Sequence, residues 1–265
     1  MLNIPRSVLS VRNMQPRKRG DEAHWIAHAT YREALTLPSV ALTANATEAA
    51  PDSEPCLELP EGQVSVLSNA VDESVFFARP KRRDPTAPIR ILGVFRLAEN
   101  KRPLLWLETM AALQQRTSLK IAPRIVGAGP LADEVRRHAA GLGLTDFALD
   151  PPVSDPSEIY RQSGALVLLS RVGGTPNVVL EAQSCALPVA ACNVGGVADA
   201  LHREGPGGGL LLPAEIEAAA AAQAIAAWLP QALEADSAPR ERFILGKYSM
   251  QALADRLLDL YGARQ

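Results

Sequence analysis

The chain has 265 residues, of which 47% are hydrophobic and 5% aromatic, and it carries 27 basic and 29 acidic side chains. This length allows one large or two small domains with a substantial core, and the balanced charge argues against a whole-protein role in binding nucleic acid or a membrane surface. The low aromatic content and the abundance of Ala, Leu and Val favour an α/β or α-rich fold over a β-sandwich.

The first 77 residues contain only short elements, too few to close a stable sheet, and they are typical of the last segment of an incomplete N-terminal domain. The run Arg17-Lys18-Arg19 is interpreted as a solvated loop, with an anion site as the alternative. We predict strands at 7–11, 39–44 and 64–67, helices at 22–35 and from 46 onward, and a loop at 51–62.

A linker is predicted at 78–88, because its three prolines and four basic residues cannot form a core element. Strands and helices then alternate regularly through 89–238, which predicts a Rossmann-like parallel sheet with helices on both faces. The strands are expected at 89–94, 119–126, 147–149, 165–169 and 187–191, with a glycine turn and a last strand together at 205–212. The helices are expected at 103–115, 131–141, 155–163, 213–229 and 239–261, with a further one that carries Glu181.

No apolar run is long enough to span a membrane. The three cysteines, Cys56, Cys185 and Cys192, have no metal-ligand spacing and are odd in number, so we interpret them as reduced thiols of a cytoplasmic protein. No acidic motif that would hold a metal is present, and we expect neither a metal nor a cofactor.

The stretch 170–200 has the pattern of an anion site. A buried strand precedes Gly173 and Gly174, which expose the backbone, and Thr175 and Pro176 are suited to the N-cap and first position of a helix. Backbone N–H groups and a helix N-terminus at one place suit a phosphate. Glu181 lies beyond the first turn of this helix, so we predict a neutral polar partner for it, such as a ribose hydroxyl.

Two cations follow the strand at 89–94, and two glycines follow the strand at 119–126. Arg96 and Lys101 suit a diphosphate, which a guanidinium fork and an ammonium charge neutralise together. Gly127 and Gly129 expose the backbone at a second strand end. Ligands of open parallel sheets bind at the carboxyl ends of the strands, so we expect these loops to lie together.

The run Gly127-Ala128-Gly129-Pro130-Leu131-Ala132 also fits a dinucleotide-binding fingerprint, with Asp150 placed about twenty residues later as a ribose-binding acid. This keeps an NAD(P)- or FAD-dependent oxidoreductase as an alternative. Against it, the motif follows the second strand of the domain, and Pro130 has no N–H to donate to a pyrophosphate.

From about Val64 onward the chain resembles the retaining GT-B glycosyltransferases of family 4, the glycosyltransferase group 1 proteins. Each motif alone is weak, and the resemblance depends on four of them in order at family-like spacing. The motifs are the turn Ser68-Asn69-Ala70-Val71-Asp72, the loop Phe95 to Pro103, the run Val126 to Leu131, and the stretch Ser170 to Gly196.

The resemblance implies a nucleoside-diphosphate sugar such as a UDP- or GDP-sugar, bound in the C-terminal domain. Arg96 and Lys101 would hold its diphosphate, and Glu181 would bind its ribose, with Val153 and Val178 at the nucleoside. The final helix, Ser249 to Tyr261, would return to the N-terminal domain. The loops at the sugar and phosphates would be formed by Gly127, Gly129, Gly174, Thr175, Pro176 and Asn177.

Two departures from the family pattern bear on activity. Gly173 stands where the family has the first glutamate of its E-x7-E motif, and the first 77 residues resemble only the last segment of the family's N-terminal, acceptor-side domain. We therefore predict the donor-binding portion of a hexosyl-type glycosyltransferase acting with retention, whose catalytic residues are unknown. The alternative is an inactive module that binds a nucleotide or a partner.

The expected partners are a nucleotide sugar, an acceptor of unknown type (glycan, lipid or small molecule) and a separate N-terminal domain chain, with no nucleic acid. The resemblance implies polysaccharide or glycoconjugate assembly in the cytoplasm, at the inner face of the membrane.

Overall fold

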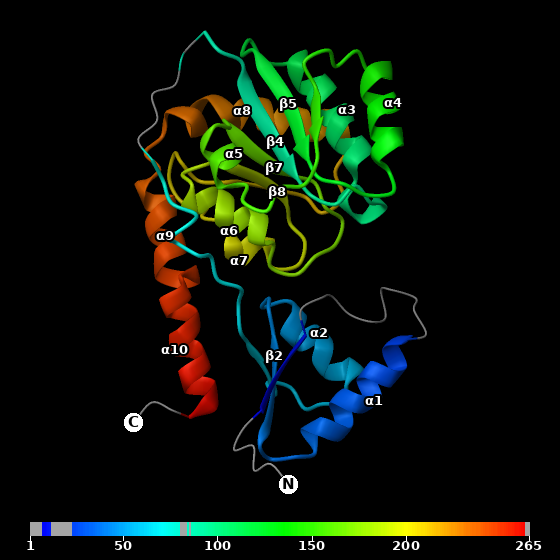
Figure 1. Ribbon diagram of the computed structural model, residues 1–265, viewed down its shortest axis with the longest axis vertical. Coiled ribbons are helices and arrows are strands. Elements are labelled where there is room, and N and C mark those ends of the chain that lie inside the picture. Colours follow the sequence, from blue (N-terminus) through cyan, green and yellow to red (C-terminus); the bar gives the residue numbers. More distant parts are fainter. Residues whose placement is uncertain (1–6, 12–22, 80–83, 85, 263–265) are drawn as a thin grey trace.

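The computed structural model describes residues 7–11, 23–79, 84 and 86–262. The loop predicted at 12–22 and part of the linker predicted at 78–88 lie outside these residues. The described chain forms two lobes, each built on a parallel sheet (Figure 1). The smaller sheet has three strands in the order β1-β2-β3, and the larger has six in the order β6-β5-β4-β7-β8-β9. The predicted α/β class is confirmed.

The smaller lobe consists of β1 (Ser7–Val11), α1 (Ala23–Leu35), β2 (Val40–Ala44), α2 (Ala49–Cys56) and β3 (Val64–Val66). Its core is a small cluster that includes Leu42, Ala44, Leu57 and Val64.

The loop predicted at 51–62 is wrong in its first half, because α2 continues through Pro51 and Pro55. Pro51 lies in the first turn, where the missing N–H costs no helical hydrogen bond, and Pro55 lies in the last. The Glu54 carboxylate accepts a hydrogen bond from the Val64 N–H at 2.9 Å, and this contact fixes the helix to β3.

The larger lobe alternates strands and helices as predicted. Its central strands β7 and β8 are buried along their whole length, because helices cover both faces of the sheet (Figure 1). The strands are β4 (Ile89–Val94), β5 (Ile121–Val126), β6 (Ala148–Asp150), β7 (Ala165–Leu168), β8 (Val189–Cys192) and β9 (Leu210–Leu212). The helices are α3 (Pro103–Gln114), α4 (Ala132–Gly141), α5 (Ser157–Arg161), α6 (Asn177–Ser184), α7 (Val197–Ala200), α8 (Ala218–Glu234), α9 (Ala238–Tyr248) and α10 (Met250–Tyr261), with a short 3₁₀ turn at Glu99–Lys101.

The strand order of the larger sheet reverses between β4 and β7. From β4 the chain moves outward through β5 to β6, then returns to the other side of β4 and continues through β7, β8 and β9. Loops that leave the two sides of such a reversal diverge and open a crevice at the carboxyl ends of the strands. The buried Trp106 side chain on α3 supports this centre, since its indole N–H donates to the Val167 carbonyl at 3.0 Å.

The last two helical predictions need correction. The helix predicted at 213–229 begins at Ala218, because the preceding segment forms a loop whose Ala214 carbonyl accepts a hydrogen bond from Arg102. The single helix predicted at 239–261 is broken at Ser249, which has an extended backbone. Ser249 caps α10 by accepting a hydrogen bond from the Ala252 N–H at 3.2 Å.

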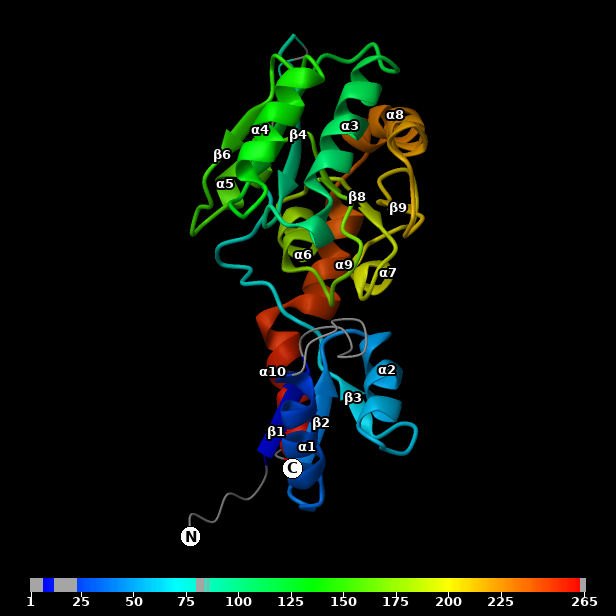
Figure 2. The same cartoon turned by 90° about the vertical axis from the view of Figure 1, so that its right-hand side faces the viewer.

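The break at Ser249 directs α10 toward the smaller lobe. The Val71 N–H donates to the Tyr248 carbonyl at 2.8 Å, and Val71 forms a parallel bridge with Ser249. Beyond this point α10 contacts β1, and the two elements lie side by side (Figure 2). The C-terminal helix thus links the lobes a second time.

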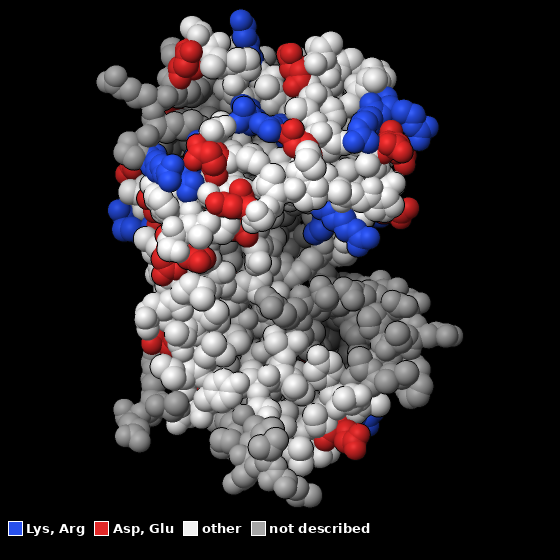
Figure 3. Space-filling model, viewed as in Figure 1, with Lys and Arg blue, Asp and Glu red and all other residues white. Residues whose placement is uncertain are grey.

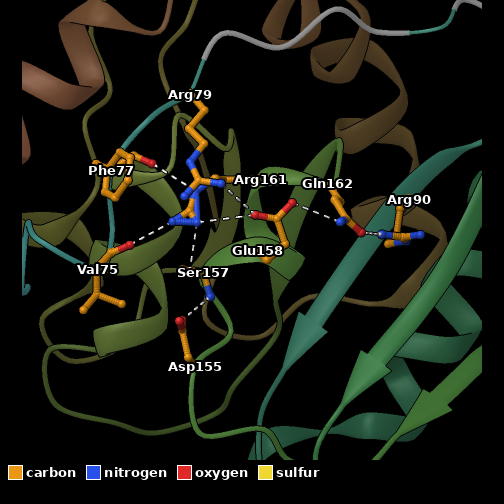
Figure 4. A network of polar contacts seen from close by, with 9 residues as sticks. All are labelled: Val75, Phe77, Arg79, Arg90, Asp155, Ser157, Glu158, Arg161 and Gln162. Atoms are coloured by element: carbon orange, nitrogen blue, oxygen red, sulfur yellow. Dashed lines mark hydrogen bonds and ion pairs between the residues drawn. The ribbon is translucent and has the colours of Figure 1, made fainter.

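The segment 71–79, which we call the strap, leaves the smaller lobe and crosses the larger one. Arg161 on α5 holds it by donating to the Val75 carbonyl at 2.9 Å and the Phe77 carbonyl at 3.3 Å (Figure 4). The same guanidinium lies over the Phe77 ring at 4.8 Å, and Arg79 lies over it at 5.1 Å. These contacts fix the path of the strap along α5.

Candidate functional site

At the strand reversal, where open parallel sheets form a crevice, the loops that follow β4 and β7 lie against each other. The Arg171 N–H of the second loop donates to the Asn100 carbonyl of the first at 2.9 Å. Arg102 joins them more deeply: its buried guanidinium donates to the carbonyls of Leu169 at 2.5 Å and Ser170 at 3.2 Å. The two loops predicted to carry ligand contacts are therefore brought together.

Gly127 and Gly129 are required by close packing. A Cβ atom at Gly127 would collide with the Phe95 carbonyl, and one at Gly129 would collide with the Leu97 carbonyl. The loop after β5 therefore lies directly against the loop that carries Arg96. The Gly127 N–H donates to the Asp150 carbonyl at 3.0 Å, so this N–H group is already engaged. The role of Gly127 is to let the loop after β5 approach the loop after β4 closely.

The same geometry weakens the dinucleotide alternative. That mechanism needs free N–H groups at the glycine turn and a free carboxylate at Asp150. The Gly127 N–H is engaged, and the Asp150 carboxylate forms an ion pair with Arg124 on the neighbouring strand.

Arg96 and Lys101 lie in the loop after β4, and within the described residues no ion pair joins either of them to a carboxylate. Arg96 is exposed, whereas Lys101 is half-buried and burial lowers the pKa of its ammonium group. A half-buried cation without a compensating anion favours binding of one. Lys and Arg side chains gather where the larger lobe overhangs the hollow between the lobes (Figure 3).

The helix that follows β7 begins one residue later than predicted. Pro176 is extended and occupies the N-cap position, and α6 starts at Asn177. Thr175 does not cap it, because its hydroxyl donates to the Asn45 carbonyl of the smaller lobe at 2.5 Å. The Asn69 amide donates to the Thr175 carbonyl at 3.0 Å and to the Asn177 side-chain oxygen at 2.7 Å. Residues of the smaller lobe thus hold the start of α6.

The two glycine pairs of this stretch pack against each other. The Gly196 N–H donates to the Gly174 carbonyl at 3.4 Å, and Gly195 adopts a left-handed backbone with φ of 54°. A Cβ atom at Gly195 would collide with the Gly173 carbonyl, and one at Gly174 would lie 2.6 Å from the Asn45 side chain. Gly173 differs from all of these, because a Cβ atom there would meet nothing within 4 Å.

Glu181 is held by a residue that the sequence analysis did not select. The buried Tyr160 hydroxyl donates to the Glu181 carboxylate at 2.8 Å. Burial raises the pKa of Glu181, and the Tyr160 hydrogen bond opposes this shift. Burial beside the carboxylate also raises the pKa of Tyr160, which keeps its proton on the phenol oxygen as a donor. Glu181 is therefore fixed in orientation and short of hydrogen-bond donors for its ionised form.

Val178 and Val153, the two other residues predicted at the nucleoside, lie on different elements. Val178 lies in the first turn of α6, one turn before Glu181. Val153 is 43% exposed in the loop between β6 and α5.

Four residues of this region were missed as contributors: Asn45, Asn69, Arg102 and Tyr160. Asn69 and Arg102 stand inside motifs that had already been recognised, so their positions in those motifs could have identified them. Asn45 and Tyr160 stand in none of the recognised motifs, and only the folding of the chain brings them next to Thr175 and Glu181.

The described residues contain no group of three or more His, Cys, Asp or Glu side chains that could hold a metal ion. None of their helices is both long and apolar enough to cross a membrane.

Comparison with protein families gives a match for residues 88–231 to the family described as "Glycosyl transferases group 1". The chain is 30% identical over 238 residues to a D-inositol 3-phosphate glycosyltransferase of Thermobispora bispora, a match that covers 83% of this chain and 55% of that protein. It is 33% identical over 115 residues to the Vi polysaccharide biosynthesis protein VipC/TviE of Salmonella typhi, covering 43% of this chain and 20% of that one.

Among solved structures, Anabaena Alr3699/HepE in complex with UDP-glucose superposes with a TM-score of 0.77 at 14% identity, covering 97% of this chain and 72% of that one. TarM superposes with a TM-score of 0.76 at 16% identity, covering 97% and 50%. At these identities the likeness concerns the fold. The chain spans about half the length, or less, of the curated relatives that it matches.

Proposed function

Because the chain belongs to the group 1 glycosyltransferases and has their GT-B fold, we propose that it binds a nucleoside-diphosphate sugar in the crevice at the strand reversal. The observation that carries this proposal is the convergence of three features at one sheet edge. These are the cations after β4, which pair with no carboxylate of the described residues, the start of α6 after β7, and the carboxylate of Glu181 held by Tyr160.

The diphosphate is assigned to Arg96, Lys101 and the start of α6. A diphosphate supplies the anionic charge that the half-buried Lys101 ammonium lacks, and Arg96 can fork onto two phosphate oxygens. Backbone N–H groups at Gly174 and Asn177 add donors, with Thr175 and Pro176 positioning them. Gly127 and Gly129 serve by letting the loop after β5 approach Arg96 closely.

The nucleoside is assigned to Glu181, Val178 and Val153. Ribose hydroxyls would donate to the Glu181 carboxylate, whose remaining acceptor sites are not used by Tyr160. This supplies the donors that burial makes the ionised carboxylate require. Val178, one turn earlier on α6, and the exposed Val153 would contact the base.

The reaction proposed for the complete site is transfer of the sugar to an acceptor with retention of configuration. The cations and helix N-terminus would stabilise the nucleoside diphosphate as it leaves. The acceptor would enter from the side of the smaller lobe, whose Asn45 and Asn69 already touch the loop beside the donor. The likeness to a polysaccharide biosynthesis protein favours an acceptor in polysaccharide assembly.

Titration with UDP, GDP and NADH tests the proposal. We expect saturable binding of one nucleoside diphosphate and none of NADH, because the Gly127 N–H and the Asp150 carboxylate are engaged. NADH binding without affinity for either nucleoside diphosphate would refute a glycosyltransferase donor site.

A second candidate, an inactive nucleotide-binding module, is favoured by Gly173. Within the described residues, no atom lies within 4 Å of a Cβ atom added at Gly173, so their packing does not require a glycine there. Measuring transfer to an acceptor, or hydrolysis of the donor, for the wild type and Gly173→Glu distinguishes the two. A gain in turnover for the variant with none for the wild type would support the inactive module.

A further inference from the structure

A second cavity lies at the opposite edge of the larger sheet from the crevice. Its volume is about 500 Å³, within the range that small organic ligands occupy. It opens where β7 and β8 begin, beside Gly164 and Pro188, whereas the crevice lies where the strands end. The walls come from the strap, α5, the end of α6 and the α8–α9 connection. None of the residues proposed to bind the nucleotide sugar lines it.

Three arginines line this cavity and give it a positive character. Arg79 is exposed on the strap, Arg161 is on α5, and Arg240 is almost fully buried on α9. Glu241 lines the cavity and accepts a hydrogen bond from Ser237, and Glu158 pairs with both Arg79 and Arg161. Asp236 also attracts Arg240 and Asp155 attracts Arg161, but neither carboxylate lines the cavity. Among the residues that line the cavity, the three arginines therefore outnumber the one carboxylate.

Arg240 is the least compensated of these cations. It donates to the carbonyls of Gly207 at 2.6 Å and Ala186 at 2.9 Å, which carry no formal charge. Its Nε is buried and has no hydrogen-bond partner within the described residues. Burial lowers the pKa of this guanidinium, and the negative charges of Glu241 and Asp236 oppose that shift without cancelling it.

The rest of the lining is apolar and includes Leu187, Pro188, Ala232 and Leu233. We propose that this cavity is a second binding site, for a small organic anion with a phosphate or carboxylate head on an apolar body. The arginines would bind the anionic head group, with Arg79 at the exposed side of the cavity and Arg240 supplying positive charge from its buried side. The aliphatic wall would take the body.

This site adjoins the nucleotide crevice through one side chain. Tyr160 lines the cavity, and its hydroxyl holds Glu181. A ligand in the cavity would therefore contact Tyr160, which orients Glu181. It would also contact the strap that joins the lobes. The resulting coupling depends on the proposed nucleotide role of Glu181, whereas binding of the anion does not.

The experiment is a titration of the full chain, labelled at its alanine and leucine methyl groups, with phenyl phosphate, benzoate and the neutral benzyl alcohol. We expect saturable shifts at the methyl groups of Ala186, Ala232 and Leu233 with both anions, and at least tenfold weaker binding of benzyl alcohol. The two anions separate a phosphate preference from a carboxylate preference. Shifts confined to other methyl groups, or equal binding of benzyl alcohol, would overturn the proposal.

Arg79→Ala is the test variant, because Arg79 is exposed and its loss should leave the fold intact. We expect it to weaken binding of the preferred anion about fivefold, the effect of one charged hydrogen-bonding partner. Arg90→Ala is the matched control, because Arg90 donates to the side chain of Gln162 at the C-cap of α5 (Figure 4) but does not line the cavity. Equal affinities for the wild type and both variants would contradict the proposal, whether or not the chain binds UDP.

Discussion

At the scale of single residues, two glycines only 22 positions apart have opposite structural requirements. Gly195 has a positive φ and no space for a Cβ atom, whereas Gly173 has ample space. Both stand in the stretch 170–200 predicted to bind an anion, Gly173 in the loop after β7 and Gly195 in the loop after β8. Local sequence could not separate them, because the obstruction at Gly195 is the carbonyl of Gly173 itself. Contacts between residues this far apart appear only in the folded chain.

The pair gives a direct stability prediction. Gly195→Ala should lower the free energy of unfolding by about 2 kcal/mol or more, since it combines a left-handed backbone with a backbone collision. Gly173→Ala should change it by less than about 0.5 kcal/mol. Urea unfolding of both variants measures the difference, and equal losses would show that the two loops do not pack as described.

Glu181 predicts a pH dependence. Its pKa is raised in the folded protein by burial, so the native state holds the proton more tightly than the unfolded chain. Stability contributed by this group is therefore fully present below the unfolded pKa and is lost as pH rises through the folded pKa.

Replacing the carboxyl with an amide removes this loss while keeping an acceptor for Tyr160. Glu181→Gln should therefore have a higher melting temperature than the wild type at pH 7, and the difference should shrink as pH falls toward 4. The exposed Glu158→Gln serves as the control. A melting temperature for Glu181→Gln at or below that of the wild type at pH 7 would argue that the carboxylate is well solvated.

At the scale of elements, the strands of the larger sheet were predicted well, because buried parallel strands are continuous apolar runs between loop residues. Errors fell where a tertiary contact decided a boundary. Pro51 and Pro55 suggested a loop but fit the two ends of α2. The start of α6 moved by one residue because Thr175 donates to Asn45 in the other lobe. The contact of Thr175 with Asn45 joins residues far apart in the chain, so local sequence does not reveal it.

The sequence pattern alone did not reveal the break between α9 and α10, although the family resemblance implied a final helix from Ser249. Ser249 has no strong breaking tendency, but its backbone pairs with Val71, and the side chain then caps α10. Because Ser249→Ala removes this cap, exchange of the Ala252 amide hydrogen should become about fivefold faster, equivalent to ~1 kcal/mol.

Ser237→Ala is the matched control, since Ser237 is at the N-cap of α9 but makes no capping hydrogen bond to its backbone. Unchanged exchange at Ala252 in Ser249→Ala, or the same acceleration there in Ser237→Ala, would contradict the assigned cap.

At the scale of the whole molecule, the strand order explains why the site could be anticipated in outline. Alternating strands and helices imply a parallel sheet, and such sheets collect their ligands at the carboxyl ends of their strands. Arg96, Lys101, the glycine loops and Glu181 could therefore be selected from sequence. Their supports, Tyr160 from α5 and Asn45 and Asn69 from the smaller lobe, could not, because only the completed fold brings these elements together.

The most direct test of the central claim is calorimetric titration of UDP or GDP, whichever binds, into the wild type, Lys101→Ala and Lys120→Ala. Lys101 lies at the crevice and Lys120 just before β5, at the opposite end of the strands. The proposed donor site predicts that Lys101→Ala weakens binding about tenfold or more, the cost of one charge-assisted contact to the diphosphate, while Lys120→Ala binds like the wild type. Equal affinity of all three proteins would contradict it.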